Sequence, residues 1–540
     1  TLPKNYIVGA TGDLQTKSEV AFMDEQVKLT GEKIESWISN MEKEKKGSFP
    51  ESSSEMKTIR YTQSQVHDFA WFADKRYGVL KGEVELPHSK RKVTSWALFT
   101  PQNAKYWKYA IEYINDGTYY YSLWNGDYPY NQVTAVDGTI SAGGGMEYPM
   151  ISFNGGRPET DGTYTENTKN GMIGVIIHEV GHNFFPMIIN SDERQWSWMD
   201  EGLNTFCQYL AEMEWDRNFP ARRGEPQDIV PYMRLDTKNQ VPIMANSENI
   251  MDFGNNAYAK PATALNILRE TVMGRELFDY AFKEYARRWA FKQPYPADFF
   301  RTLEDASGVD LDWFWKGWFY GTEPVNQSIE TVEWFGIDTQ DPVAKKAGDK
   351  ATAQAKRQTI SSIRNKTDIK STVVEENPDL TDFYNTYDRF APTDADKKKY
   401  EDYIASLNED EKKLVAQGKN FYVINFKNKG GLPMPVIIKL NYEDGTEEVL
   451  RFPAEVWRLN DVEAKKIIPT SKKVVKWTLD PYYEIADIDT DDNAFPREPA
   501  KPTKVQLFKM QRRSYSIDGN PMQDAKKAKE AAGAVTGSKN

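Results

Sequence analysis

The chain has 540 residues and a formal net charge of −11, and 39% of its residues are hydrophobic and 13% aromatic. This length predicts about two to four domains with ample material for packed cores. No basic stripe is interleaved with aromatic residues, which argues against nucleic acid as a partner, and no stretch approaches the ~20 apolar residues of a transmembrane helix. The single cysteine, Cys207, excludes internal disulfides and is expected to be a buried, inert thiol.

The first 322 residues change from strand-like to helical patterns. A strand-like segment at residues 1–12 is followed by a charged stretch that predicts a helix over residues 19–46. Strand-like runs then alternate with one helix up to about residue 153, whereas residues 169–321 are mainly helical in pattern. We therefore expect residues 80–322 to form one domain with a mixed β half and a helical half.

The pentapeptide His178-Glu179-Val180-Gly181-His182 lies within the helical half. Positions i and i+4 share one face of a helix, so both histidines can direct a ring nitrogen at one metal ion while Glu179 lies beside it. The surrounding stretch is too apolar for a solvated helix face, which argues against a chance match.

A carboxylate follows the pentapeptide at the right distance to complete a zinc site. Glu201 comes after eighteen intervening residues, on a run whose apolar residues recur at helical spacing. A carboxylate carried into apolar surroundings needs a compensating charge. The sequence therefore predicts one Zn²⁺ per chain, bound by His178, His182 and Glu201, with an open fourth position where water becomes a nucleophile near neutral pH. Glu179 is the candidate base that accepts the water proton and returns it to a leaving group.

With this third ligand the sequence resembles the aminopeptidase N-type zinc peptidases, the gluzincin family that includes the leukotriene hydrolases. Upstream, the segment Gly144-Gly145-Met146-Glu147 is similar to the family's substrate-binding edge strand, with Tyr148 where the family usually has asparagine. Downstream, Tyr258-Ala259-Lys260 resembles the segment that carries the family's oxyanion-stabilising tyrosine. The resemblance runs from about residue 66 to residue 319.

The resemblance implies a fold and the roles of further residues. Glu147 is expected to hold the free α-ammonium group of a peptide, next to the backbone of Gly144, Gly145 and Met146, and Tyr258 to donate a hydrogen bond to the oxyanion. Residues 80–322 are expected to be thermolysin-like. Residues 1–79 are expected to be the remnant of a mostly missing N-terminal β domain with a helical excursion, so that the chain lacks its native N-terminus. A periplasmic or secreted location is slightly favoured.

The last 218 residues change character twice. Residues 323–418 are polar and rich in lysine, and are predicted to form a linker with packing helices. Residues 419–498 contain short strands and an Asp-Gly turn, which predict an Ig-like β-sandwich. Residues 499–540 are predicted to be a partly disordered tail. The predicted fold class is therefore multidomain α+β.

The sequence as a whole indicates a zinc-dependent aminopeptidase that removes N-terminal residues from peptides with a free N-terminus. Three alternatives stay open. They are a zinc endopeptidase with the same metal site, a leukotriene-type epoxide hydrolase, and a non-catalytic peptide-binding protein. Cleavage of acetylated peptides would favour the endopeptidase, and a long apolar tunnel the epoxide hydrolase.

Overall fold

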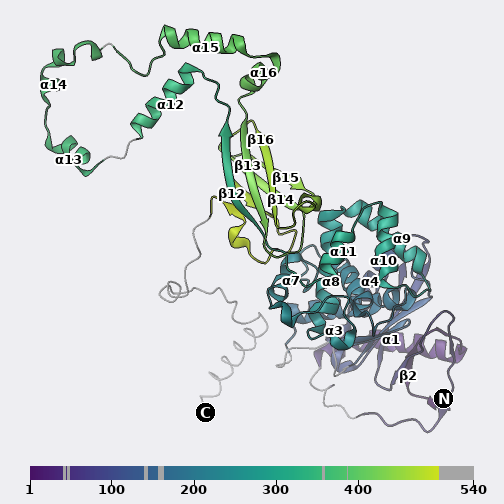
Figure 1. The fold of residues 1–540 in the computed structure, drawn as a ribbon. Helices are drawn as coiled ribbons and strands as arrows, with labels where there is room; N and C mark the ends of the chain where they lie inside the picture. Colours follow the sequence, from purple (N-terminus) through teal and green to yellow (C-terminus); the bar gives the residue numbers. More distant parts are fainter. Residues whose placement is uncertain are drawn as a thin grey trace, which may run out of the picture.

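The computed structural model describes residues 1–40, 44, 49–138, 144–155, 163–355, 359–385 and 387–497. It shows a multidomain α+β chain: a region of sheets and helices is followed by a separate unit of two β-sheets (Figure 1). The predicted class is thereby confirmed at this level. Within the described ranges, no helix combines the length and apolar character needed to cross a membrane. The predicted tail, residues 499–540, lies outside the described residues.

The N-terminal region consists of one long helix and three small sheets. Helix α1 (Lys17–Ser39) lies where the sequence predicts a helix over residues 19–46. The buried Glu19 of this helix forms an ion pair with Lys57, with Nζ 2.7 Å from Oε1. This ion pair fixes the helix against the strands. The sheets pair β1 (Leu2–Pro3) with β4 (Met56–Lys57), β2 (Ile7–Ala10) with β6 (Trp71–Asp74), and β3 (Asp13–Leu14) with β5 (Tyr61–Thr62).

A five-stranded mixed sheet forms the β half of the next region, in the order β10-β11-β9-β8-β7. Its strands are β7 (Gly78–Glu85), β8 (Lys92–Phe99), β9 (Gln132–Asp137), β10 (Gly145–Tyr148) and β11 (Ile151–Asn154). Strand β10 is an edge strand, paired on one side only, with β11. Its Tyr148 ring packs against Phe72 at 5.8 Å within an apolar cluster, which holds the edge strand in position.

The helical half is built around α5 (Glu166–Gly181), which is buried on most of its surface because its apolar residues occupy more than one face. The Thr165 side chain caps its N-terminus by accepting from the Thr168 amide at 3.0 Å. The other helices are α3 (Ala104–Trp107), α4 (Ala110–Asn125), α6 (Glu201–Trp215), α7 (Pro226–Met233), α8 (Lys260–Ile267), α9 (Arg275–Trp289), α10 (Pro296–Ser307) and α11 (Asp312–Trp318). Short turns of π- or 3₁₀-helix connect them, among them η2 (Asn183–Ile188), η3 (Ser197–Met199), η5 (Ser247–Asn249) and η6 (Gly254–Ala259).

The C-terminal unit has two sheets that enclose one apolar core. The first has the order β12-β13-β16 and the second β15-β14-β17-β18. The strands are β12 (Gln327–Gly336), β13 (Asn420–Asn428), β14 (Val436–Tyr442), β15 (Glu447–Phe452), β16 (Glu463–Thr470), β17 (Val474–Leu479) and β18 (Ala494–Phe495). Strand β12 lies within the predicted linker 323–418, so the sheet begins earlier than the predicted boundary at residue 419.

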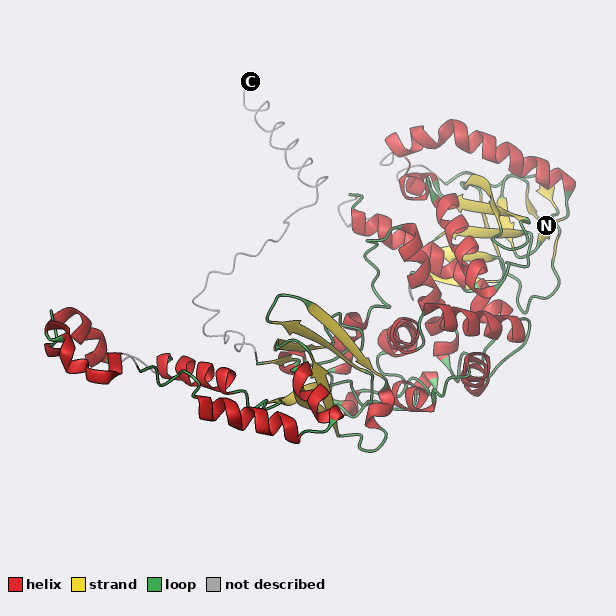
Figure 2. Ribbon diagram, turned by 90° about the horizontal axis from the view of Figure 1, so that it is seen from above, coloured by secondary structure: helices red, strands yellow, loops and turns green. Residues whose placement is uncertain are grey.

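Among the described residues, five α-helices and the 3₁₀-helix η8 (Pro378–Asn385) lie between β12 and β13 in the sequence. They extend away from the sheets, on the side opposite the helical half (Figures 1 and 2). Pro342 is the one buried residue among the described residues of these helices, so little apolar surface holds them to the rest of the chain. The α-helices are α12 (Pro342–Gln354), α13 (Ile360–Asp368), α14 (Val373–Glu376), α15 (Asp394–Ser406) and α16 (Glu409–Gln417).

Candidate metal centre

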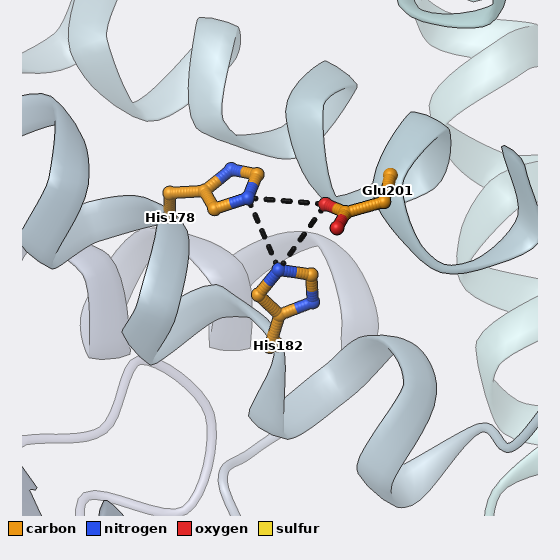
Figure 3. Close-up of side chains that lie close together, drawn as sticks. All are labelled: His178, His182 and Glu201. Carbon is orange, nitrogen blue, oxygen red and sulfur yellow. Dashed lines mark hydrogen bonds and ion pairs between the residues drawn. The ribbon is translucent and has the colours of Figure 1, made fainter. Parts of the chain in front are cut away.

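Three side chains from two helices converge on one point (Figure 3). His178 and His182 lie one turn apart on α5 and its end, and Glu201 is the first residue of α6. The Nε2 atoms of the two histidines are 3.0 Å apart, and Glu201 Oε2 lies 3.2 Å from His178 Nε2 and 3.4 Å from His182 Nε2. The three atoms therefore form a nearly equilateral triangle.

The triangle has the dimensions that a tetrahedral zinc ion requires. A Zn–N or Zn–O distance of about 2.0–2.1 Å in tetrahedral geometry separates the ligand atoms by roughly 3.3 Å. The observed separations of 3.0 to 3.4 Å fall at this value. Two imidazoles and one carboxylate are also the donor types of catalytic zinc sites, so the residues present fit the ion.

Hydrogen bonds orient both imidazole rings toward the triangle. His178 Nδ1 lies 2.8 Å from Gln208 Oε1, and the amide nitrogen of Gln208 donates to Glu212 at 2.8 Å. His182 Nδ1 lies 2.8 Å from the carbonyl oxygen of Phe185 and 2.9 Å from Asp200 Oδ1. When each Nδ1–H donates to these acceptors, each Nε2 presents its lone pair to a metal.

Charge and burial act in opposite directions on the ionisable groups of the cluster. Burial lowers the pKa of His178, and the neighbouring His182 lowers it further. Burial opposes a charge on His182, but Glu147, Asp200 and Glu201 outweigh it and raise the pKa of that imidazole. Burial also opposes ionisation of Glu201, yet the charge of His182 and the bonds from both histidines lower the pKa of its carboxyl group. The surplus of carboxylates means that the site favours a bound cation.

Glu179 lies next to the triangle and is 4% exposed. Burial raises the pKa of its carboxyl group well above the usual range, and Oε2 is a buried atom without a hydrogen-bond partner among the described residues. Edge strand β10 comes so close that a Cβ atom on Gly145 would stand 2.5 Å from Glu179 Cδ. Glycine at this position therefore allows the strand backbone to lie directly beside the carboxylate.

Tyr258, on η6, lies on the other side of the triangle. Its hydroxyl donates to Glu201 Oε1 at 2.5 Å, and its ring stacks on the His178 ring with centroids 5.9 Å apart. Burial and the charge of Glu201 raise the pKa of this phenol, so it keeps its proton at neutral pH. The guanidinium of Arg223 lies over the same ring, 4.4 Å from its centroid.

Glu147, on β10, belongs to two groups of acidic and histidine side chains. One of its carboxylate oxygens lies within 4.8 Å of atoms of Glu179 and His182, and one lies equally close to Glu193 and Asp200. Glu193 comes from the connection between η2 and η3. It could not be predicted from the sequence, because only folding brings that connection to β10. Gln208 and Glu212 were also missed, although they lie seven and eleven residues after Glu201 on one face of α6.

All of the predicted site residues line one cavity of about 1120 Å³. The lining includes Gly144, Gly145, Met146 and Glu147 at β10, together with His178, Glu179, His182, Glu201 and Tyr258 from the helical half. Cys207 is buried away from this lining, as predicted, and burial raises the pKa of its thiol to about 12. A cavity that combines a three-donor metal cluster, an adjacent carboxylate and a protonated phenol is of the type found in mononuclear metallohydrolases.

The chain is similar in sequence to known aminopeptidases. Residues 110–318 match the peptidase family M1 domain. The chain is 26% identical over 212 residues to glutamyl aminopeptidase of Sus scrofa, which covers 36% of this chain and 21% of that protein. It is 23% identical over 310 residues to "Probable aminopeptidase 1" of Sulfurisphaera tokodaii, which covers 53% of this chain and 39% of that protein. The similarity to peptidase family M1 therefore lies in residues 110–318, and both of these relatives are named aminopeptidases.

The solved structure of Legionella pneumophila aminopeptidase A, in complex with aspartic acid, shares the fold. Its TM-score is 0.50 at 14% identity, and the match covers 78% of this chain and 39% of that chain. The stretch matched by the family includes Glu147, Glu179, Tyr258 and the three candidate ligands. The chain spans about a fifth to two fifths of the length of the curated relatives named above, at 21% and 39%.

Proposed function

We propose that this chain is a zinc-dependent aminopeptidase that hydrolyses N-terminal residues from peptides. One Zn²⁺ per chain would be held by His178, His182 and Glu201. The observation that carries the proposal is the position of Glu147, whose carboxylate lies within 4.8 Å of both Glu179 and His182 in the same cavity. A negative charge so close to the reaction centre suits a substrate whose free amine is next to the bond that breaks.

When bound, Zn²⁺ would polarise the scissile carbonyl and lower the pKa of a coordinated water from about 15.7 to about 7. Glu179 would accept the proton of the attacking water and return it to the leaving amine, for which its poorly hydrated carboxylate is well suited. Tyr258 would donate a hydrogen bond to the oxygen that becomes negative in the transition state. The backbone of Gly144, Gly145 and Met146 on the edge of β10 would align the peptide.

The carboxylates near Glu147 support recognition of an ammonium group. Oxygens of Glu147, Glu193 and Asp200 lie within 4.8 Å of one another. Two like charges at about 4 Å repel each other by about 1 kcal/mol in water and about 4 kcal/mol at a protein surface. A cation among the three relieves this repulsion, and the α-ammonium of a peptide is the cation that the proposed reaction supplies.

The fold supports finer proposals about the units. We infer that residues 80–322 form a thermolysin-like catalytic unit, because a mixed sheet with edge strand β10 packs beside α5 and α6. The two C-terminal sheets would form an Ig-like sandwich that braces this unit. A slight preference for a periplasmic or secreted location stays a prediction from the sequence.

A panel of fluorogenic aminoacyl amides with one N-acetylated control tests the function directly. We expect the zinc-loaded protein to release the fluorophore from free-amine substrates and to act poorly on the acetylated one. Equal cleavage of acetylated peptides at internal bonds would replace the proposal with a zinc endopeptidase. No turnover of any peptide, with zinc bound, would favour a peptide-binding protein.

Replacing Glu147 with alanine should reduce kcat/KM on free-amine substrates by roughly ten- to a hundredfold, because a charge-assisted contact contributes about 1.5–3 kcal/mol. Acetylated substrates lack the charge, so their slow cleavage should change little and the gap between the two should narrow. Glu248→Gln is the matched control, since it removes a carboxylate from the same cavity that is already paired with Arg194. An equal loss on both substrate types would refute the role of Glu147.

Replacing Tyr258 with phenylalanine should lower kcat by about 10²–10³-fold, the usual effect of removing one oxyanion donor. The hydroxyl also bonds Glu201, so zinc content must be measured in the same sample. Tyr280→Phe, on the exposed surface of α9, serves as the control and should retain full activity. Loss of zinc together with activity in the Tyr258 variant would assign the tyrosine to metal binding instead.

A further inference from the structure

Arg223 is a cation in the cavity that no carboxylate neutralises. Among the described residues its guanidinium forms no ion pair or hydrogen bond, and its contact is the cation–π interaction with Tyr258, 4.4 Å from the ring centroid. Burial lowers the pKa of its guanidinium, which shows that the charge is poorly hydrated. An arginine has five N–H donors, and a cation–π contact uses none of them.

The carboxylates nearest to Arg223 are already engaged. Glu201 interacts with both histidines and accepts from the Tyr258 hydroxyl. Glu212 accepts from the Gln208 amide at 2.8 Å. Arg223 lines the cavity, and none of its side-chain nitrogens is a fully buried atom without a partner. These nitrogens therefore face the open cavity. The donors are therefore available to a ligand.

Acidic groups and Arg223 lie in different parts of the cavity. Glu147 lies within 4.8 Å of His182 and, in a second group, of Glu193, and its charge raises the pKa of the His182 imidazole. Arg223 lies on the Tyr258 side, and the charges that act on it are those of Tyr258, Glu201 and Glu212 rather than Glu147. A peptide with its amine at Glu147 and its first carbonyl at the metal ligands would continue toward Arg223.

The distances set how far along the peptide this contact falls. The Arg223 guanidinium lies 4.4 Å from the centroid of the Tyr258 ring, and that centroid is 5.9 Å from the centroid of the His178 ring. An extended peptide covers about 3.3–3.6 Å per residue, so two ring contacts correspond to roughly one to three residues. The group that meets the guanidinium therefore belongs to the first or second residue after the bond that is cut.

We propose that Arg223 is a specificity-determining residue that binds a carboxylate on the leaving-group side of the substrate. The carboxylate is either the C-terminus of a di- or tripeptide or the side chain of Asp or Glu at the second position. This inference rests on the proposed peptidase function and adds a preferred substrate class, short or acidic peptides. Arginine suits the role because its planar fork can bind a carboxylate through two parallel hydrogen bonds.

The test compares matched substrates that start with the best residue of the amide panel, written X. One pair is X-Ala-Ala and its C-terminal amide, and the other is X-Glu-Ala-amide and X-Gln-Ala-amide. We expect the wild-type protein to favour the carboxylate in at least one pair by about tenfold or more in kcat/KM, and the pair that responds identifies the source. Arg223→Gln should abolish that preference and leave the neutral substrates within a few-fold, whereas Arg223→Lys should retain part of it.

The neighbouring Arg222→Gln is the control for charge alone, since Arg222 is exposed and donates to Asn167. The Arg222→Gln variant should keep the wild-type preference for the carboxylate substrate. The proposal is overturned if wild type shows no preference in either pair, if Arg222→Gln loses it equally, or if Arg223→Gln slows charged and neutral substrates alike.

A binding assay separates failure of this inference from failure of the proposed function. In the zinc-loaded Glu179→Gln protein, calorimetry should give a lower Kd for X-Ala-Ala than for its amide, and adding Arg223→Gln should remove the difference. If wild type hydrolyses nothing but this difference is seen, Arg223 binds carboxylates in a protein that is not a peptidase. If wild type hydrolyses free-amine amides and no carboxylate effect is seen in rates or binding, only the Arg223 proposal falls.

Discussion

Replacing His182 with alanine should remove both the zinc and the peptidase activity. The substitution deletes one of three donors from a triangle with edges of 3.0 to 3.4 Å, and with it the geometry that selects a tetrahedral ion. It also leaves Glu201 and Asp200 facing an empty position, because both interact with the His182 ring. Elemental analysis after dialysis should find less than about a tenth of the wild-type zinc, since metal affinity depends on the complete donor set.

His67→Ala is the matched control for this experiment. His67 is exposed, and its Nε2 lies 3.1 Å from Met187 Sδ, outside the metal-binding triangle. This variant should keep full zinc occupancy and activity. Circular dichroism must show that the His182 variant is folded, because the ring is 1% exposed and its loss creates a cavity. Full zinc occupancy in a folded His182→Ala protein would rule out the proposed ligand set.

Replacing Glu179 with glutamine should lower kcat by about 10²–10⁴-fold while zinc content stays the same. Glutamine has nearly the same shape, so it should fill the space beside Gly145, but it cannot accept a proton. The Glu179 carboxyl group is not part of the triangle formed by His178, His182 and Glu201, so we expect the metal to be retained. Measuring kcat and KM separately is informative, because the loss should appear mainly in kcat.

Activity that survives in the Glu179 variant would point to another base in the cavity. Glu193→Gln, which removes a neighbouring carboxylate outside the proposed proton path, is therefore the useful companion. It should raise KM for free-amine substrates more than it lowers kcat. If Glu193→Gln lowered mainly kcat and Glu179→Gln raised mainly KM, Glu193 would be the base and Glu179 would bind the substrate amine.

The local motif around α5 could be predicted well because its geometry depends only on helical periodicity. The spacing of His178 and His182 fixes their common face wherever the helix lies. Glu201 was found by its distance along the chain, and Tyr258 and Glu147 by resemblance alone, since nothing in their own surroundings distinguishes them. The structure brings all of these into one cavity.

Residues whose role depends on the path of a connecting segment could not be predicted. Glu193 and Arg223 lie outside helices and strands, so no helix or strand periodicity predicts the direction of either side chain. The backbone between η2 and η3 has to fold before Glu193 meets Glu147, and only packing of η6 brings Tyr258 under Arg223. In both cases the contact joins segments that are distant in sequence.

The first strand of the C-terminal unit was missed for a related reason. Apolar and polar residues alternate in part of strand β12, but the strand comes directly before a long polar segment. Its composition is similar to that of this segment, so the sequence predicts it as part of the linker. Its partner β13 begins at Asn420. The preference of a residue for a β-strand depends strongly on the neighbouring strand that buries one of its faces. The pairing of Ile329 with Phe426 therefore could not be predicted from the sequence.

Strands β12 and β13 pair as an antiparallel hairpin. The α-helices between them, α12 to α16, are therefore an insertion in the connection of this hairpin. Gly336 lies opposite Asn420, so the two ends of the inserted segment meet at adjacent positions of one ladder. The entropic cost of closing such a loop grows only with the logarithm of its length, about 0.6 kcal/mol for each doubling. The inserted segment can therefore lengthen, shorten or change sequence during evolution with little effect on the stability of the sheets. New surface can therefore be added in the segment between β12 and β13 without disturbing the cavity that contains His178, His182 and Glu201.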